Sequence, residues 1–351
     1  MSVIKLLHTA DWHLDSPLVG RSEEQTRLLR RELLQLPGRI AALCRQENCQ
    51  LVLISGDIFD GPCSADSLAV LKNALAEMAV PVFISPGNHD FAHISSPWLT
   101  EQFPDNVRIF TRQSWEKVCL EDLGLTIYGA GFTAMDCPGL LQDFHTEERA
   151  VAVVHGDPTQ VSSPYCPVTH AQVADSGLAY LALGHIHKSG HFKAGSTLCA
   201  WPGCPMGRGY DEQGEKGVYI VALEDEASLR FVPLDVPRFF DLETTPEGLD
   251  SLLPPVGSRD FYRVTLVGES EKPDLEALCA AYSRFPNLEL RDRTVPPVDI
   301  WKSAGEDSFE GTYFRLLQDS LAGKNQEEQN KILLAAKICR RILDGQEVVL
   351  P

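Results

Sequence analysis

The sequence predicts an α/β fold in which two sheets are covered by helices, and three observations lead to this prediction. Short apolar runs alternate with helical patterns over the first two thirds of the 351 residues, which is typical of strands joined by crossing helices. Residues 107–132 and 217–234 instead show a strand–turn–strand pattern. Hydrophobic residues make up 44% of the chain and charged residues 23%, so the composition is that of a globular protein with ample core.

The strand candidates are short apolar runs that are each followed by polar residues. They cover residues 3–7, 51–54, 82–85, 150–154 and 180–183. A helical pattern covers residues 23–46, and its Pro37-Gly38 pair predicts a kink or a break. A second helix is predicted at 66–78, after the capping residue Ser64.

The last third of the chain has a different character, beginning near Val236-Pro237. A small α/β unit is predicted from a strand at 261–267, a helix at 274–283 and a strand at 288–291. The predicted domains are residues 1–237, a capping domain at 238–305 and a helical segment at 306–351.

Two helices are predicted in the final segment, at 309–321 and 327–343, and Gly345 ends the second. This helix carries an apolar stripe of Leu334, Ile338 and Ile342. The stripe would either fold onto the domain or dock a partner's coiled coil.

Charge and cysteine content narrow the class of protein. The formal net charge of −18 argues against general affinity for polyanions. No apolar run approaches the roughly 18 residues that span a bilayer, and the start of the chain has no secretory pattern. The ten cysteines include no C-x-x-C, which favours reduced cysteines in a cytoplasmic protein without membrane association.

The chemistry of the chain is concentrated after its strands, because each of the five apolar runs ends in a polar cluster. The clusters are Asp11-Trp12-His13, Gly56-Asp57, Gly87-Asn88-His89-Asp90, His155-Gly156-Asp157 and Gly184-His185-Ile186-His187. Ligands of open α/β sheets bind at the carboxyl ends of strands, so the clusters are expected to converge. Their oxygen and nitrogen donors, without thiolate, suit Mn²⁺, Fe or Zn.

Spacing within the clusters supports a two-metal site. Asp11 and His13 are two apart, so on an extended segment both side chains point the same way and can ligate one ion. His185 and His187 share this spacing, although a short turn would let them reach different ions. Asp57 is the natural bridge between two metals roughly 3.5–4 Å apart.

The motif series D-x-H, G-D, G-N-H-D, H and G-H-x-H resembles that of the calcineurin-like metallophosphoesterases. This resemblance implies a four-layer α/β/β/α domain followed by a small α/β capping domain and C-terminal helices. Residues 8–17, HTADWHLDSP, are similar to the SbcD-type DNA-repair exonucleases and especially to their YhaO-like branch. The motifs cover about residues 3–187, and the later α/β unit resembles a capping domain only in placement and pattern.

The resemblance also implies a role for each motif residue. The first metal would be held by Asp11, His13, Asp57 and His187. The second would be held by Asp57, Asn88, His155 and His185. His89 resembles the family's catalytic histidine, and Asp90 would orient its ring. The two divalent ions are expected to be Mn²⁺, with Mg²⁺, Fe and Zn as alternatives, and their chemistry would be phosphodiester hydrolysis by a hydroxide that they activate.

Several residues outside the motifs are candidates for substrate contact. Asp15 lies beside the first motif, His191 follows the last, and Arg208 belongs to a Gly/Pro-rich loop, residues 201–210. By contrast, Asp60 is expected to cap a turn, and His8 to pack or hydrogen-bond beneath the site.

The function implied by the resemblance is that of the Mn²⁺-dependent DNA nuclease in a larger complex. Its partners would be an SMC-like, SbcC-type ATPase, bound through the C-terminal helices, and a second copy of the chain. One alternative is a phosphomonoesterase or small-substrate phosphodiesterase, which would need neither the capping domain nor the helical tail. Another is a silent scaffold, which should lack some of the ligands.

Overall fold

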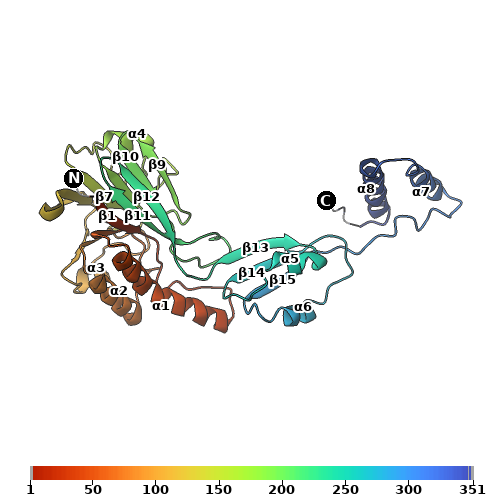
Figure 1. Cartoon of the computed structure of the whole chain (residues 1–351), viewed down its shortest axis with the longest axis horizontal. Helices are drawn as coiled ribbons and strands as arrows, with labels where there is room; N and C mark the ends of the chain where they lie inside the picture. The colour runs from red at the N-terminus through yellow and green to blue at the C-terminus, as the bar shows by residue number, and fades with distance from the viewer. Residues whose placement is uncertain (1–2, 347, 349–351) are drawn as a thin grey trace. The chain divides into compact units, whose positions relative to one another are not determined.

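The computed structural model describes residues 3–346 and 348 (Figure 1). It contains two compact units, Met1–Phe239 and Phe240–Pro351. The first unit carries two six-stranded sheets and the second a three-stranded sheet with helices. The α/β architecture predicted from the sequence is confirmed.

The first sheet has the strand order β12-β11-β1-β2-β3-β4. Its strands are β1 (Ile4–Thr9), β2 (Leu51–Ile54), β3 (Val82–Ile84), β4 (Val107–Ile109), β11 (Gly217–Leu223) and β12 (Ala227–Pro233). Strands β1 to β4 run parallel, whereas β11 and β12 form an antiparallel pair that joins β1. The parallel strands therefore direct their carboxyl ends to one edge of the sheet.

The second sheet has the order β5-β6-β7-β8-β10-β9. Its strands are β5 (Glu116–Leu120), β6 (Leu125–Gly129), β7 (Ala150–Val154), β8 (Tyr180–Leu183), β9 (Gly190–Ala194) and β10 (Thr197–Trp201). The central strands β6, β7, β8 and β10 are parallel, and both outer strands are antiparallel.

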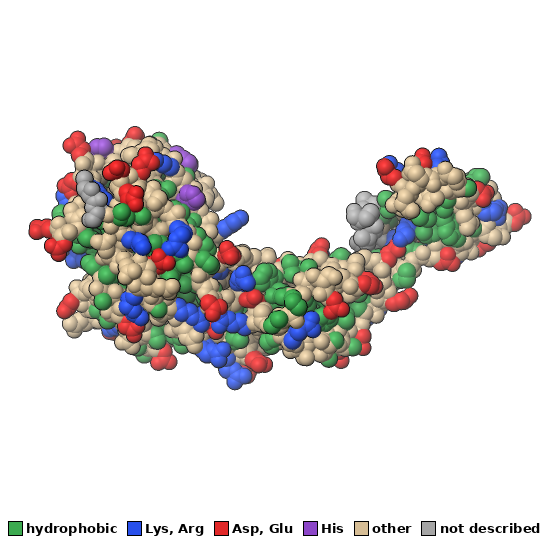
Figure 2. Space-filling model, viewed as in Figure 1, with side chains coloured by type: hydrophobic (Ala, Val, Ile, Leu, Met, Phe, Trp, Pro, Cys, Tyr) green, Lys and Arg blue, Asp and Glu red, His purple; other side chains and the backbone are tan. Residues whose placement is uncertain are grey.

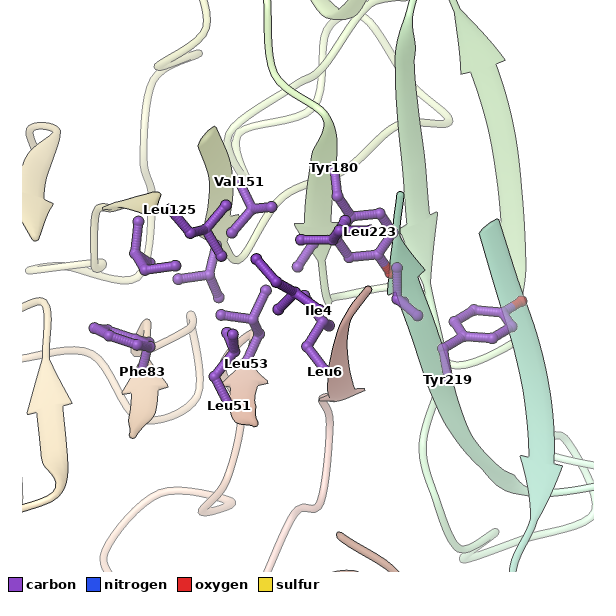
Figure 3. Packing of buried hydrophobic residues seen from close by; sticks show 14 of the residues in the cluster. Ile4, Leu6, Leu51, Leu53, Phe83, Leu125, Val151, Tyr180, Tyr219 and Leu223 are labelled. Carbon is purple, nitrogen blue, oxygen red and sulfur yellow. The ribbon is translucent and has the colours of Figure 1, made fainter. Parts of the chain in front are cut away.

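The main core lies between these two sheets (Figure 3). Ile4 and Leu6 of β1 and Leu51 and Leu53 of β2 pack in one cluster with Val151 of β7. Both faces of these parallel strands are buried, which explains why they appear in the sequence as unbroken apolar runs.

Helices α1 (Glu23–Gln46), α2 (Ala65–Met78) and α3 (Pro97–Thr100) lie beside the first sheet (Figure 1). Helix α1 begins with a capping box between Ser22 and Gln25. It continues through Pro37, so the predicted break is wrong. Leu33 and Ile40, on either side of the proline, are both fully buried, and this packing offsets the roughly 3 kcal/mol cost of an interior proline.

The outer face of the second sheet is covered by α4 (His170–Asp175) and long loops. Phe132, Cys166 and Val173 from this layer pack against Val154 and Leu183 of the sheet. This fourth layer therefore contains less helix than the four-layer description implies.

The second unit contains β13 (Phe239–Thr244), α5 (Leu249–Leu252), β14 (Phe261–Leu266), α6 (Leu275–Ala281) and β15 (Leu288–Asp292). Strands β14 and β15 are parallel. Tyr262 and Val264 of β14 form a separate small core with Leu249 and Phe285.

The C-terminal helices are α7 (Phe309–Asp319) and α8 (Gln326–Leu343). Their contact centres on Phe314, which packs with Ala336 and lies under the Arg340 guanidinium at 4.4 Å. Arg340 is fully buried and pairs with Glu310. Ile342, from the predicted apolar stripe, is 62% exposed.

Acidic side chains are scattered over the visible face of each unit, with Lys and Arg among them (Figure 2). All ten cysteines are free. None of the described helices combines the length and the apolar character needed to cross a membrane.

Candidate metal centre

The polar clusters follow the carboxyl ends of five parallel strands, three in the first sheet and two in the second. Backbone hydrogen bonds join the first two clusters: Asp11 N–H donates to the Gly56 carbonyl at 3.0 Å, and His13 N–H to the Asp57 carbonyl at 2.9 Å. A side-chain bond joins the sheets, because Ser85 Oγ donates to the Ala130 carbonyl at 2.6 Å. The predicted convergence is therefore built into the sandwich.

Four of the predicted ligands have left-handed backbone conformations. The φ angles are 55° at Asp11, 47° at His13, 51° at Asp57 and 83° at His185. Non-glycine residues rarely adopt this conformation, which costs of order 1–3 kcal/mol and occurs most often at functional sites. These four residues lie in the turns that directly follow the strands.

A first group of donors surrounds His13. Its Nε2 lies 3.1 Å from His187 Nε2 and 3.8 Å from Asp57 Oδ2. Asp11, His13 and His187 each bring a ligand atom within 4.8 Å of the others. Asp11 and His13 are completely buried, whereas the His187 side chain is 32% exposed, so the group meets solvent on the His187 side.

A second group surrounds His155. Its Nε2 lies 2.9 Å from Asn88 Oδ1 and 3.5 Å from Asp57 Oδ2. His185 Nδ1 is 3.2 Å from the same Asn88 oxygen. The single oxygen Asp57 Oδ2 thus faces both groups, while Asp57 Oδ1 accepts from the His89 N–H at 2.9 Å.

Two of the predicted histidine ligands, His13 and His185, have the protonation state that cation binding needs. His155 Nδ1 lies 2.8 Å from the Ser55 carbonyl, and its Nε2 lies 2.9 Å from Asn88 Oδ1. Burial lowers the pKa of His13, and burial with His155 lowers that of His185 to about 4. Both rings are therefore neutral near pH 7, as ligation requires.

Asp11 Oδ2 is buried and has no hydrogen-bond partner among the described residues. An unpaired buried carboxylate oxygen is costly without a cation. The residues present therefore fit divalent metal ions.

The His89 ring is held by Asp60, not by Asp90 as the resemblance implies. Asp60 Oδ1 accepts from His89 Nδ1 at 2.7 Å, and this hydrogen bond raises the pKa of His89. Asp90 instead accepts from the backbone N–H groups of Gly87 at 2.7 Å and Ile58 at 2.8 Å. The expected role of Asp90 is corrected: its carboxylate is buried and joins two ligand-bearing loops.

Glu212 is a site residue that sequence reasoning missed. Its Oε1 accepts from His187 Nδ1 at 2.7 Å, so His187 presents its Nε2 to the metal group. Arg208 lies 2.6 Å from the same oxygen and 3.4 Å from Asp60 Oδ2. Arg208 therefore connects the carboxylate behind His187 with the carboxylate behind His89. The only sequence signal was the four-residue spacing of Arg208 and Glu212 in a Gly-rich loop.

A third group, His187, Cys204 and Glu212, also has metal-ligand geometry. Its cationic partners are already present, because the Lys216 ammonium lies 3.3 Å from Cys204 Sγ and Arg208 pairs with Glu212. Burial raises the pKa of Cys204 to about 12, which keeps the thiol protonated. We therefore interpret this group as the support behind His187.

The structure places two of the three candidate substrate residues elsewhere. Asp15 accepts from Ser64 N–H and Ser64 Oγ, both at 2.8 Å, so its carboxylate caps α2. His191 is exposed on the outer strand β9, and its ring lies 6.4 Å from that of Tyr219. Arg208 alone joins the centre, where Glu212 holds its guanidinium.

Residues 4–189 match the model of the calcineurin-like phosphoesterases, and the chain belongs to this family. The uncharacterized metallophosphoesterase YhaO of Bacillus subtilis is 31% identical over 238 residues, which cover 62% of this chain and 57% of that protein. The SbcD component of the nuclease SbcCD, from the same organism, is 25% identical over 267 residues, covering 62% of this chain and 66% of the relative. The match thus spans less than two thirds of each relative.

Solved structures with similarity include a dimetal phosphatase from Danio rerio, with a TM-score of 0.45 and 15% identity. That comparison covers 65% of this chain and 98% of the other. The protein TT1561 of Thermus thermophilus has a TM-score of 0.40 and 10% identity, covering 66% of this chain and 99% of the other.

Proposed function

We propose that the protein is a metal-dependent phosphodiesterase that cleaves DNA. The observation that carries this proposal is the position of Asp57, whose Oδ2 faces His13 at 3.8 Å and His155 at 3.5 Å. One carboxylate shared by two donor groups is the arrangement of a two-metal hydrolase.

The chain's residues would divide the work as follows. Asp11, His13, Asp57 and His187 would hold one ion, and Asp57, Asn88, His155 and His185 the other. When bound, the two ions supply an activated water nucleophile and neutralise charge on the phosphate. Glu212 fixes the His187 ring through its 2.7 Å hydrogen bond and thereby keeps the ligand atom in place.

His89 would act on the leaving group. Its side chain is 43% exposed, unlike the buried ligands, and Asp60 holds Nδ1. Nε2 is therefore free to face a substrate, and the carboxylate stabilises the protonated ring. A proton held there can pass to the departing oxygen.

The DNA substrate is supported by the 25% identity to the SbcD component of the nuclease SbcCD. On this basis we propose Mn²⁺ as the metal, an SbcC-type ATPase as partner and a homodimer as the working form. The exposed Phe309, Leu316 and Ile342 on α7 and α8 support a docking role for the helical segment. The ten free cysteines support a reducing compartment, such as the cytoplasm.

The deciding experiment offers the purified chain labelled linear DNA and, separately, a chromogenic phosphomonoester, each with Mn²⁺. Cleavage of DNA is expected. Turnover of the monoester without DNA cleavage, with or without an ATPase partner, would favour the phosphomonoesterase alternative. Hydrolysis of neither would favour the scaffold.

The role of His89 has its own test. His89→Ala should bind metal as the wild type does while its kcat falls by about 10²–10⁴-fold, the usual contribution of a general acid. Asp60→Asn should give a smaller loss of kcat, because the ring remains but loses its orienting partner. Unchanged kcat in His89→Ala would refute the assignment.

A further inference from the structure

A pocket of about 610 Å³ opens beside His89, between the start of α2 and the segment that leads into α3. Phe59, Pro62, Leu68, Phe91 and Pro97 give it apolar walls, and His89 lies at its edge. Its volume is within the range of small-molecule sites. The pocket is thus continuous with the residue assigned to the leaving group.

The pocket is not built for phosphate. No Lys or Arg is among its lining residues, which include the carboxyl groups of Asp90 and Glu101. The adjacent N-terminus of α2 is already capped, because Ser64 and Asp15 accept from its donors. Apart from the histidine rings, an anionic group would therefore find no compensating positive charge there, whereas an uncharged flat group would find apolar and aromatic walls.

One polar atom in the pocket wall lacks a partner. Ser96 lines the pocket and is 2% exposed, and its Oγ has no hydrogen-bond partner among the residues described by the structure. A buried unsatisfied hydroxyl costs stability, and such groups recur where a ligand supplies the missing bond. Ser96 offers one donor and one acceptor to the polar edge of a ring.

We propose that this pocket binds the nucleobase of the nucleoside that leaves on the His89 side. This inference rests on the proposed phosphodiesterase function and deepens it. The oxygen that receives a proton from His89 carries the leaving nucleoside, so its base falls beside His89, and its next phosphate is disfavoured by walls that carry two carboxyl groups and no Lys or Arg. The base is then recognised by stacking on the half-buried Phe91 and by a hydrogen bond to Ser96.

A binding experiment tests the pocket without turnover. Cys63 lines the pocket and is half-buried, whereas Cys119 is exposed on β5. In the full-length metal-free chain, thymidine or adenosine at millimolar concentration should slow alkylation of Cys63 several-fold and leave Cys119 unaffected, as read by peptide mass spectrometry. Inorganic phosphate should protect neither thiol. Equal alkylation of Cys63 with and without nucleoside would overturn the proposal.

Variants test its use in catalysis. Ala65→Phe fills the pocket from the first turn of α2, and Ala69→Phe, also exposed on α2 but outside the pocket, is the matched control. Oligonucleotides carrying an abasic residue on one or the other side of the scissile bond report base recognition. The wild type and Ala69→Phe should lose about tenfold in kcat/KM when the leaving-side base is missing, and Ala65→Phe should show no such preference.

The variant Ser96→Ala tests the proposed hydrogen bond between Ser96 and the base. It removes an unpaired hydroxyl, so its thermal stability should equal or exceed that of the wild type, while nucleoside protection of Cys63 weakens several-fold. Unchanged protection would refute the role of Ser96. Bis(p-nitrophenyl) phosphate, which carries no base, separates the two proposals. If the wild type with Mn²⁺ does not hydrolyse it, the phosphodiesterase function fails. If the wild type hydrolyses it but shows no base preference with the abasic oligonucleotides, the pocket proposal alone is overturned.

Discussion

Asp57 contacts both groups of metal donors and also the His89 backbone, because its two carboxylate oxygens have different partners. Oδ1 accepts from the His89 N–H, and Oδ2 faces a histidine of each metal group. Its carboxylate is buried, yet the neighbouring histidines His155, His13 and His89 hold its pKa below the ordinary value against the effect of burial. It is therefore ionised and ready to bind cations across the neutral range.

We predict that Asp57→Asn reduces the metal content from two ions per chain toward none, because the shared negative ligand is lost. Mass-spectrometric metal analysis after dialysis against Mn²⁺ checks this. Asp122→Asn, an exposed change far from the ligand groups in sequence, is the control and should retain both ions. A count near two in Asp57→Asn would contradict the bridging role.

The buried His8 makes the stability of the folded chain depend on pH. It is fully buried between the Tyr180 hydroxyl at 2.7 Å and Ser55 Oγ at 2.8 Å, and burial lowers its pKa to about 3. The unfolded chain binds a proton at about 6.5, so this residue's contribution is complete above pH 6.5 and is lost as the pH falls toward 3.

We therefore expect His8→Gln to be less stable than the wild type at pH 7, with the difference narrowing by about 2 kcal/mol at pH 5. Denaturant unfolding of both metal-free proteins at the two pH values measures it. Other histidines titrate in both proteins, so the comparison isolates His8. A difference independent of pH would show that His8 is not held neutral.

At the scale of elements, the turns after the strands determine how closely the ligand-bearing segments pack against one another. A Cβ on Gly87 would collide with Asp57 Oδ1, and a Cβ on Gly184 would collide with the Ser55 carbonyl and approach His155 Nδ1 at 2.9 Å. At these two positions no side chain larger than that of glycine fits without displacing the neighbouring atoms. In contrast, a Cβ on Gly38 in α1 would meet nothing within 4 Å.

We predict that Gly87→Ala weakens Mn²⁺ binding by about 10–100-fold, because the added Cβ displaces the Asp57 carboxylate. Loss of a group that supports a metal ligand weakens metal binding by the same factor. Isothermal titration calorimetry gives the affinity. The control Gly38→Ala should leave binding unchanged and stabilise the helix by about 0.5–1 kcal/mol. Wild-type affinity in Gly87→Ala would mean that the turn relaxes without moving the ligand.

Helix α1 and the loop behind His187 show where local pattern and tertiary contact disagree. Pro37 predicts a kink or a break, yet Leu33 and Ile40 are both buried and the helix continues without a break. Glu212 looks like an ordinary loop acid, yet it is 8% exposed and holds His187. In both cases long-range packing outweighs local propensity.

At the scale of the whole molecule, the charge of −18 bears on how DNA would be held. Two divalent ions would add four positive charges at the centre, and the protein would remain strongly acidic. A nuclease of this kind is expected to gain affinity from a partner.

We predict that the isolated chain with Mn²⁺ binds long duplex DNA only at about 10⁻⁴–10⁻⁶ M near 0.15 M salt, the range of nonspecific binding, and more weakly as salt rises. Filter binding or anisotropy with the His89→Ala variant measures this without cleavage. Nanomolar binding by the isolated chain would contradict the need for a partner.

The strands and the polar clusters at their ends could be predicted from the sequence by itself, because each depends on neighbouring residues. Spacing of two in Asp11-x-His13 and an apolar run before each cluster are local signals. Only the tertiary structure decided which acid holds His89, that Asp15 caps α2, and that Arg208 connects Asp60 with Glu212. Those contacts join residues up to 148 positions apart. Local chemistry indicates which atoms could bind a metal, but the choice of partner for each depends on burial and distance, which arise only when the sheets pack together.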